Sequence, residues 1–268
     1  MTKMNPTWVV CLKQVPREPV FKRTGDSFQL DRERVEGILN PYDRSALEAA
    51  RTLKGEAGGS VVAVTMGPPA AEEVLREAMA LGADRAVLLT DPEFAGADTL
   101  ATAHVLAAAV RKLDRFDLIL CGARTLDSDT GQVGPQLAEL LDVPMAAYVL
   151  SVALRKDELR VERRLDGTRE KLAIKLPALI TVEGQARIKD PVSLKLLEQA
   201  FLERSITRWT REDLAVDPSC VGWTGSATRA KEYRVIERKR SGEVLECGTG
   251  EAVDRILSIL MDRNILGR

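Results

Sequence analysis

Apolar residues in the first 150 positions occur either in short continuous runs or at intervals of three and four. A continuous run is typical of a strand buried on both faces, and the wider spacing is typical of a helix with one apolar face. Asn40 followed by Pro41 predicts a helix start, as does Asp98 or Thr99. Strands are expected at 8–12, 58–67, 86–89 and 116–122, helices at 40–54, 69–81 and 97–113, and a hairpin at 22–35.

The alternation of strands and helices predicts a parallel sheet built from βαβ units. Residues 151–184 instead alternate apolar and polar positions, which favours two or three antiparallel strands that extend the sheet. An amphipathic segment follows, then a stretch of mixed charge, then a short closing helix. The expected fold class is therefore α/β: a Rossmann-like parallel sheet with an antiparallel extension and a C-terminal arm that ends in a short helix. We expect a nucleotide-binding domain with its extension and a docking segment at 1–215, and the arm at 216–268.

The composition of the chain limits the partners and the kinds of site that it can be expected to have. The 268 residues carry a net charge of −1, so nothing favours a nucleic-acid partner, and no apolar run reaches the length of a membrane helix. The first residues turn polar too soon for a signal peptide, which predicts a cytoplasmic protein. The four cysteines form no CxxC pair, so no metal site or disulfide framework is indicated. With His104 as the single histidine, a bound cofactor is the expected source of any redox chemistry.

The most polar loop follows the fourth predicted strand and reads CGARTLDSDTGQVGPQ at 121–136. Ligands of parallel sheets lie outside the carboxyl ends of the strands, where this loop is expected. Its glycines and hydroxyls next to a helix start suit a phosphate, and its carboxylates suit ribose hydroxyls. The alternative is a solvated loop in which an Asp caps the helix, and neither GxGxxG nor a Walker sequence decides between them.

Nearly the whole chain resembles the β subunit of electron transfer flavoprotein. The resemblance runs in order through VCLKQVP, LNPYDRSALEAARTLKG, VVAVTMGPP, the loop at 121–136 and the closing EAVDRILSILMDRNILG. The loop and LPALIT at 176–181 are its most specific parts.

The resemblance implies a heterodimer with an α subunit that carries most contacts to an electron-transferring FAD. The arm of the β subunit is implied to wrap around this α subunit. It also implies a nucleotide in this chain's own crevice: AMP in the ordinary members, and a second FAD in the bifurcating and nitrogen-fixation-associated types. The implied contacts are Cys11, Asn40, Met66 and the loop residues Gly122, Ala123, Arg124, Thr125, Leu126, Asp127, Ser128, Asp129, Thr130, Gly131, Gln132 and Val133.

Two motifs resemble the second-FAD type. One is DSDTGQVGP in the loop, and the other is ADTLATA, in which Asp98, Thr99 and Thr102 are candidates to reach a pyrophosphate or flavin. Arg124 is a candidate partner of a phosphate or of a reduced flavin ring. The alternatives are a plain helix cap at Asp98 or Thr99 and a surface ion pair of Arg124 with Asp127 or Asp129. On these motifs FAD is favoured over AMP.

Many family members dock acyl-CoA dehydrogenases through an apolar tip followed by a lysine-rich run. The candidates for the tip here are Leu194, Leu196 and Leu197, with Leu196 preferred, although all three also fit the inner face of a helix. The basic run is replaced by Glu198 and Glu203, which puts that partner in doubt. Similarly, the family's VERE pattern becomes Val161-Glu162-Arg163-Arg164, at a segment implied to hold the mobile flavin domain of the α subunit.

Three functions are compatible with the sequence. The leading hypothesis is an electron carrier subunit between a flavin-dependent dehydrogenase and a quinone reductase or ferredoxin, with oxidoreductase activity only as part of a complex. The second is a subunit of an NADH-dependent bifurcating enzyme. The third is a nucleotide-binding stress or sensor domain, which the strands after residue 150 and the arm after residue 216 speak against.

Overall fold

The computed structural model divides into two compact units, Met1–Glu232 and Tyr233–Arg268. The first contains a nine-stranded sheet, and the second contains one helix. The residues that the structure describes are 5–17, 21–24, 27–30, 36–156, 158–184, 192–229, 242 and 244–265.

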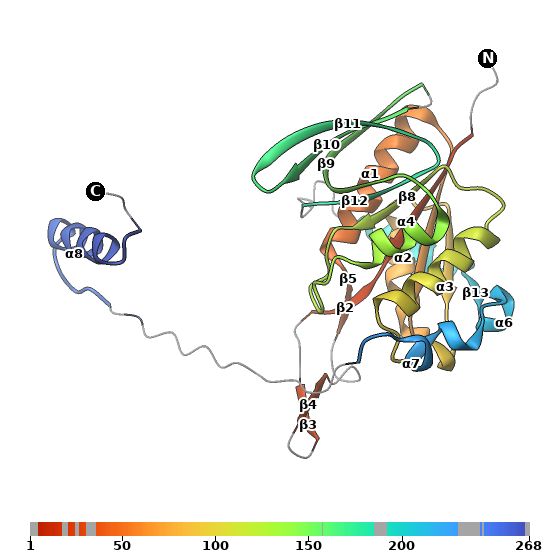
Figure 1. Cartoon of the computed structure of the whole chain (residues 1–268), viewed down its shortest axis with the longest axis horizontal. Helices are drawn as coiled ribbons and strands as arrows, with labels where there is room; N and C mark the ends of the chain where they lie inside the picture. Colours follow the sequence, from red (N-terminus) through yellow and green to blue (C-terminus); the bar gives the residue numbers. More distant parts are fainter. Residues whose placement is uncertain are drawn as a thin grey trace. The chain divides into compact units, whose positions relative to one another are not determined.

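Parallel strands form the centre of the sheet, as the sequence predicts (Figure 1). The strands β1 (Thr7–Leu12), β6 (Ser60–Met66), β7 (Arg85–Leu89) and β8 (Leu118–Gly122) are almost wholly buried. Strand β1 pairs with β6 on one side and with β8 on the other. Burial on both faces explains why these strands are continuous apolar runs.

The antiparallel extension is confirmed as β9 (Met145–Arg155), β10 (Glu158–Leu165) and β11 (Thr168–Lys175). The last strand of this segment, β12 (Ala178–Val182), is not part of the antiparallel extension. This strand runs parallel to β8 and lies between β8 and β9. Its sequence ALITV is a continuous apolar run with every residue buried, the pattern of a central parallel strand.

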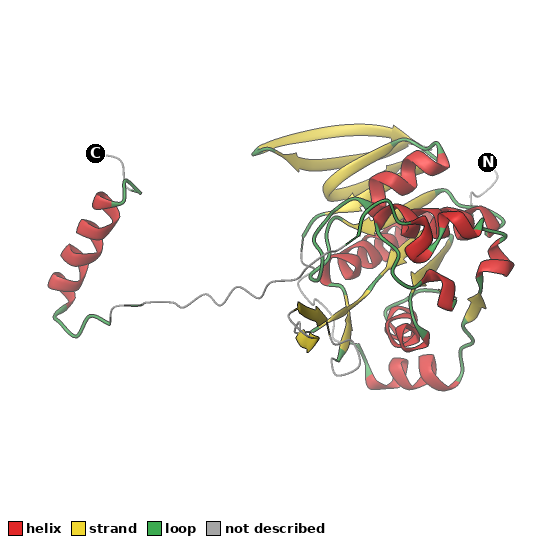
Figure 2. Cartoon of the chain, turned by 60° about the horizontal axis from the view of Figure 1, so that its bottom comes forward, coloured by secondary structure: helices red, strands yellow, loops and turns green. Residues whose placement is uncertain are grey.

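Helices cover both faces of the sheet (Figure 2). On one face, α1 (Pro41–Ala57) and α2 (Glu72–Ala80) pack with side chains such as Trp8 and Val10. On the other, α3 (Thr99–Lys112) and α4 (Val133–Leu141) pack against Val9 and Cys11. The period-two alternation within β1 therefore divides the core into two layers.

The strand order reverses between β1 and β8. The chain passes through α1 from β1 to β6 and then, on the other face, through α3 from β7 to β8. In an open α/β sheet such a switch point leaves a crevice at the carboxyl ends of the two strands. The ends of β1 and β8, at Lys13 and Gly122, are thus where the fold favours a ligand.

Short elements complete the first unit. The predicted hairpin is confirmed by β3 (Phe21–Thr24) and β4 (Ser27–Leu30), and β2 (Gln14–Pro16) pairs with β5 (Gly37–Leu39). The remaining elements are the 3₁₀ turns η1 (Pro69–Ala71), η2 (Pro92–Phe94) and η3 (Pro218–Cys220), the helices α5 (Leu194–Leu202), α6 (Arg211–Leu214) and α7 (Gly222–Gly225), and the edge strand β13 (Thr207–Trp209).

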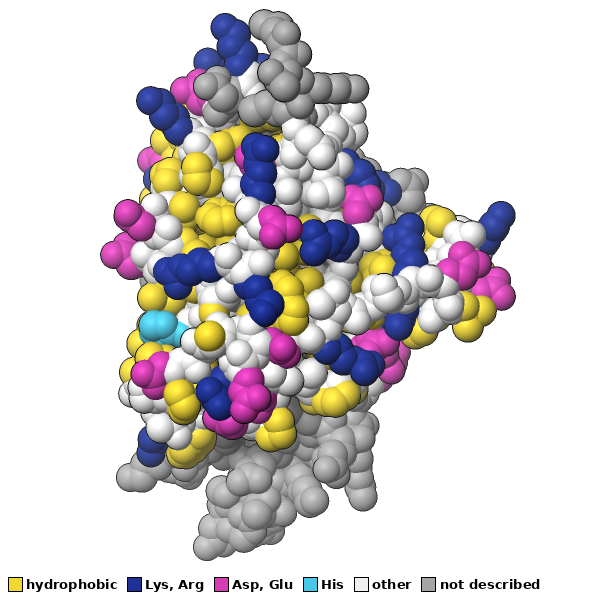
Figure 3. All heavy atoms as spheres, turned by 90° about the vertical axis from the view of Figure 1, so that its right-hand side faces the viewer, with side chains coloured by type: hydrophobic (Ala, Val, Ile, Leu, Met, Phe, Trp, Pro, Cys, Tyr) yellow, Lys and Arg dark blue, Asp and Glu magenta, His cyan; other side chains and the backbone are white. Residues whose placement is uncertain are grey.

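The segment after residue 215 continues as packed structure, because η3 packs against α7, and α7 packs against η2 and α3. The first compact unit ends at Glu232. On the side of the molecule where Figure 1 shows α3 and α6, positive and negative side chains are interspersed (Figure 3). The boundary at 215/216 and the role of the arm stay predictions.

The second unit contains the predicted closing helix, α8 (Thr249–Asp262). None of its residues is buried, and Val253, Ile256, Leu257 and Met261 form an exposed apolar stripe. Within the described parts of the chain, no helix has the length and apolarity to cross a membrane.

Candidate functional site

Asp43, in the first turn of α1, joins the two strand ends at the switch point. One carboxylate oxygen accepts the backbone N–H of Lys13 at 2.8 Å, and the other accepts the backbone N–H of Gly122 at 2.9 Å. The residue is only 5% exposed. A single buried carboxylate therefore holds the exits of β1 and β8 against the start of α1.

Burial raises the pKa of the Asp43 carboxyl to about 7. The amide of Asn40 and the two backbone N–H groups favour the charged form and oppose this rise without cancelling it. The pKa of the nearby Cys121 thiol is also raised, by its hydrogen bond with Cys11, by burial and by the charge of Asp43. The floor of the crevice is thus a region where negative charge is disfavoured.

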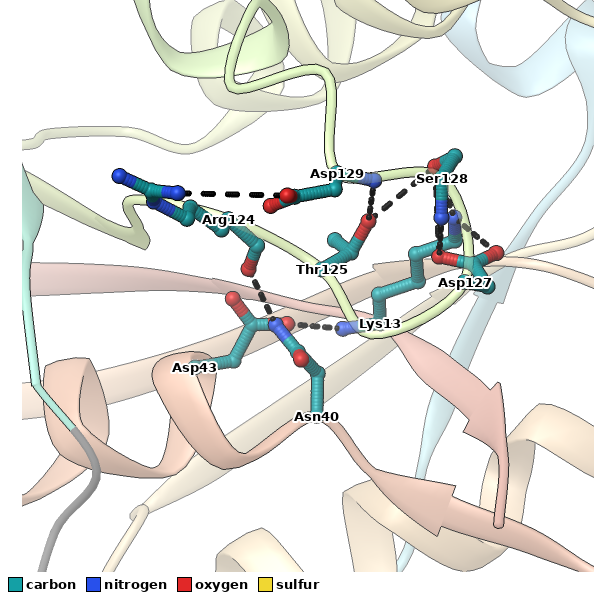
Figure 4. A network of polar contacts seen from close by, with 8 residues as sticks. All are labelled: Lys13, Asn40, Asp43, Arg124, Thr125, Asp127, Ser128 and Asp129. Atoms are coloured by element: carbon teal, nitrogen blue, oxygen red, sulfur yellow. Dashed lines mark hydrogen bonds and ion pairs between the residues drawn. The ribbon is translucent and has the colours of Figure 1, made fainter. Parts of the chain in front are cut away.

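Asn40 lies beside this carboxylate and is completely buried. Its Nδ2 donates a hydrogen bond to the backbone oxygen of Arg124 at 2.8 Å, whereas its Oδ1 has no partner (Figure 4). A buried polar atom without a partner costs roughly 1–3 kcal/mol. Asn40 therefore leaves one acceptor free for a hydrogen-bond donor.

The loop after β8 arches over Lys13, Asn40 and Asp43 (Figure 4). Lys13 Nζ contacts Asp127 Oδ2 at 2.6 Å and ties the loop to the end of β1. Burial raises the pKa of Asp127, but the hydrogen bond and charge of Lys13 outweigh it and hold that pKa below its usual value. Within the loop, Thr125 and Ser128 bind each other at 3.1 Å. Of the carboxylates predicted as ribose partners, Asp127 is thus already held in a defined position.

The loop leads into α4, whose first turn has no side-chain cap. The N-cap residue Gln132 makes no side-chain capping hydrogen bond. The first amides of a helix attract anions when no side chain occupies them. With the ammonium group of Lys13 on the other side of the loop, the site combines two features that suit a phosphate.

The start of α3 is closed in comparison. Asp98 accepts hydrogen bonds from the amides of Leu100 and Ala101, both at 3.0 Å, so it is a helix cap. Its second oxygen accepts from the backbone and hydroxyl of Thr228 at 2.8 and 2.9 Å. Burial raises the pKa of Asp98, but these hydrogen bonds outweigh it and lower the pKa overall. The capping interpretation is confirmed for Asp98, and a contact of Asp98 to a cofactor stays a prediction.

Thr99 lies nearer to the loop. Its hydroxyl is 3.1 Å from Oε1 of Gln132 and so joins the beginnings of α3 and α4. Thr102, one turn further along α3, is half-buried. The structure brings Thr99 next to the loop, and the contribution of both threonines to binding stays a prediction.

Among the described residues, Arg124 makes two long ion pairs, 3.9 Å to Asp129 and 3.8 Å to Glu183. The predicted pairing with Asp129 is thus present, whereas Asp127 pairs with Lys13 instead. The guanidinium carbon lies 5.8 Å from the ring centre of Tyr148. Tyr148 has a φ of 58°, an uncommon conformation for a bulky residue. Arg124 is therefore placed at the crevice with loose contacts that a ligand can replace.

Two further predicted contacts lie at strand ends. Cys11 and Cys121 are opposite each other in β1 and β8, and Met66 is the half-buried last residue of β6. The structure thus groups Cys11, Asn40 and the loop around one crevice, with Met66 on the next strand.

Lys13 and Asp43 were missed as individual residues by sequence reasoning. An Asp in a first helical turn is usually explained by the helix dipole, so Asp43 carried no separate signal. Lys13 was one of several polar residues after a strand. Their roles emerge only from the pairing of β1 with β8.

The predicted docking leucines are separated on α5. Leu197 packs against the core, as the inner-face alternative proposes, whereas Leu194 is 85% and Leu196 is 47% exposed. Phe201 and Leu202 add to the exposed apolar surface. Among the described residues, no group of three or more acidic, histidine or cysteine side chains is arranged for a metal ion.

The residues at the crevice fit an adenine nucleotide. The free acceptor of Asn40 suits an amino group of a base, and the uncapped start of α4 with Lys13 suits its phosphate. Fold and site together define a Rossmann-like α/β protein whose polar loop lies at its topological switch point, where such folds place their ligands.

The comparison with known families identifies the protein more closely. The profile of the electron transfer flavoprotein domain matches residues 27–202. The chain belongs to the electron transfer flavoprotein family, which confirms the resemblance stated from its motifs.

Its relatives match over most of their length. It is 39% identical to electron transfer flavoprotein subunit beta of Clostridium acetobutylicum, covering 96% of this chain and 99% of the relative. It is 37% identical to the caffeyl-CoA reductase-Etf complex subunit CarD of Acetobacterium woodii, covering 95% and 96%. Protein FixA of Azorhizobium caulinodans is 43% identical, covering 83% and 82%. The chain is thus of the β-subunit type.

Proposed function

We propose that this chain holds an adenine nucleotide, FAD or AMP, in the crevice between β1 and β8, as the β subunit of a heterodimeric electron carrier. The buried, unpartnered Oδ1 of Asn40 is the observation that carries the proposal. The amide orientation of Asn40 is fixed because its Nδ2 is bonded to Arg124. An acceptor of fixed direction selects a donor such as the amino group of adenine.

The phosphate is assigned to the loop and the first turn of α4. Backbone amides there and Lys13 provide positive potential, while the Thr125 and Ser128 hydroxyls provide further hydrogen bonds. A flavin, when bound, would supply one- and two-electron redox chemistry. This chain's residues would hold and orient it, with Arg124 near any negative charge.

The partner surfaces follow from exposed apolar side chains. The stripe of Ile256 and Leu257 on α8 is proposed to contact the α subunit, with which the FAD of the electron carrier is shared. The exposed Leu194 and Leu196 on α5 are proposed to dock a flavin-dependent dehydrogenase. A quinone reductase or ferredoxin is the proposed acceptor, and the cytoplasm the proposed compartment.

The first experiment is to co-express the chain with its α subunit, denature the purified complex, and quantify FAD and AMP by chromatography. Two FAD per heterodimer would place a flavin in the crevice, and one FAD with one AMP would make this chain a holder of AMP. A complex in which the crevice contributes no nucleotide would contradict the proposal.

The site itself is tested by Asn40→Ala. Loss of this free acceptor should lower nucleotide retention in this crevice about tenfold, since one hydrogen bond to a buried group contributes about 1–1.5 kcal/mol. Thr52→Ala is a control, because its exposed hydroxyl bonds only within α1, to the Glu48 carbonyl at 2.9 Å. Equal retention in both variants would sink the assignment of Asn40.

An NADH-dependent bifurcating enzyme is distinguished by the same preparation. It requires a second flavin that NADH reduces, so two FAD per heterodimer followed by rapid bleaching with NADH would favour it. A sensor domain would instead bind ATP without a flavin or an α subunit.

A further inference from the structure

Asp43 differs from the other carboxylates of the crevice because it faces inward and not toward the predicted ligand. It contacts the Lys13 amide on one side and the Gly122 amide on the other, and its charged form is favoured by the Asn40 amide. The residue thus touches the end of β1, the start of the loop and the buried amide that presents a free acceptor.

The space between this carboxylate and the start of the loop is filled. A Cβ added to Gly122 would lie 2.4 Å from Asp43 Oδ1 and 2.7 Å from the Cβ of Tyr42. The start of the loop therefore lies directly against the first turn of α1. A change in the position of Asp43 would be transmitted to the Gly122 amide, because no gap can absorb it.

We propose that Asp43 is a positioning residue for nucleotide binding. As an anion, Asp43 fixes the Gly122 amide and the Asn40 side chain, so that the free Asn40 acceptor and the loop face the ligand. This inference rests on the proposed function. It goes further by assigning to a residue beneath the site control over how the crevice holds its ligand.

The same geometry makes binding depend on pH. An anionic carboxylate accepts both strand-end N–H groups, whereas a protonated one has a hydroxyl that cannot accept in the same way. Since burial raises the pKa of Asp43 to about 7, the two forms exchange near neutral pH. Nucleotide retention is expected to fall as the pH falls through this range.

Two charged or titratable groups lie next to Asp43, and a third contacts one of them. Lys13, directly after β1, contributes its charge, Cys121 from β8 has a raised pKa, and Asp127 from the loop has a lowered pKa because Lys13 binds it. Burial and partners thus keep Cys121 neutral and Asp127 charged near neutral pH. The pH dependence is therefore assigned to Asp43.

Asp117 provides a matched control at the opposite end of the same strand pair. Its Oδ2 accepts the backbone N–H of Thr7 at 2.8 Å, just before β8 begins. Asp117→Asn removes the charge of a strand-end carboxylate, as Asp43→Asn does, but away from the crevice and at a residue whose other oxygen pairs with Arg115 at 2.6 Å. Comparison of the two variants separates a general effect on the sheet from an effect on binding.

The experiment uses the purified heterodimer with its α subunit, as wild type, Asp43→Asn and Asp117→Asn. The nucleotide that remains in the crevice after dialysis is quantified between pH 5.5 and 8.5, and added FAD and AMP serve as probes for rebinding. The phosphate of AMP itself titrates near pH 6, so the wild-type profile is read against that of Asp43→Asn with the same probe.

We expect wild-type retention to rise about tenfold from pH 6 to pH 8, Asp43→Asn to stay at the low level throughout, and Asp117→Asn to follow the wild type. Asp43→Asn with the wild-type profile would overturn the inference, as would an equal loss in Asp117→Asn. If Asp43→Asn does not fold, a flat wild-type profile with FAD would overturn it. A wild-type complex without nucleotide in this crevice would overturn the proposed function itself.

Discussion

Two acidic residues of the predicted site, Asp98 and Asp127, have different partners. Asp98 is occupied by the amides of its own helix and by Thr228, whereas Asp127 is bound to the Lys13 side chain. A capping carboxylate cannot leave its amides without a loss of stability, but an ammonium–carboxylate pair can rearrange around an incoming phosphate. At the scale of residues, the loop is therefore better suited to respond to a ligand than the start of α3.

Replacement of the cap should be visible as a loss of stability. Asp98→Ala is expected to lower the free energy of unfolding at pH 7 by about 1–2 kcal/mol, measured by urea titration. Because the pKa of Asp98 is lowered in the folded state, its stabilisation is complete above the unfolded value of 3.8 and is lost as the pH falls through the folded pKa. The difference between the two proteins should accordingly shrink below about pH 4.

Asp114→Ala, which removes an exposed carboxylate beyond the other end of α3, is the control and should change the free energy of unfolding by less than about 0.5 kcal/mol. If both variants lose the same stability, the cap is not the cause.

At the scale of elements, the site depends on the close approach of β8 to α1. Gly122 ends β8 directly against Asp43, and Gly134 lets α4 lie against β12, since a Cβ there would be 2.5 Å from Thr181 Cγ2. Strand and helices can meet at this distance only where a side chain is absent. The crevice is consequently defined by contacts between elements as well as by its polar side chains.

Gly122→Ala is expected to destabilise the protein by about 1–3 kcal/mol, because the added methyl group overlaps a buried carboxylate and adjacent backbone. Gly55→Ala is a matched control on α1, where an added Cβ has nothing within 4 Å. It should stabilise the helix by about 0.5–1 kcal/mol. Thermal unfolding of both variants measures the contrast, and a Gly122→Ala protein as stable as the wild type would contradict the tight packing.

The buried parallel strands and main helices could be predicted because each has a strong period of its own. The place of β12 could not be predicted in this way, since its apolar run follows three alternating strands and only the pairing with β8 shows that it is central. Asp43 was missed for a similar reason. Its partners, Lys13 and Gly122, are brought to it by strand pairing that no local pattern encodes.

At the scale of the whole molecule, the chain consists of a sheet-based unit and a separate unit with one amphipathic helix. The apolar residues of α8 remain exposed, and Ile256, for example, is 50% exposed. Helices with such a stripe usually bury it against another surface. The proposed α subunit is the partner whose presence would satisfy this helix.

Ile256→Glu should weaken association with the α subunit by at least tenfold, because a charge would be buried at the contact. Size-exclusion chromatography of the co-expressed subunits, with isothermal titration where they separate, measures the change. Ser258→Glu adds the same charge on the polar side of α8 and should leave association within about twofold of the wild type. Normal association of Ile256→Glu would exclude this face of α8 from the interface.

The position of β12 has a consequence for how the protein is made. On a ribosome, β9, β10 and β11 emerge before β12, yet β9 joins the parallel strands only through β12. The finished three-stranded ribbon therefore cannot join the parallel strands until residues 178–182 leave the exit tunnel and insert beside β8. A nascent chain that stalls before this point would present an unpaired edge of β8, which chaperones are suited to protect.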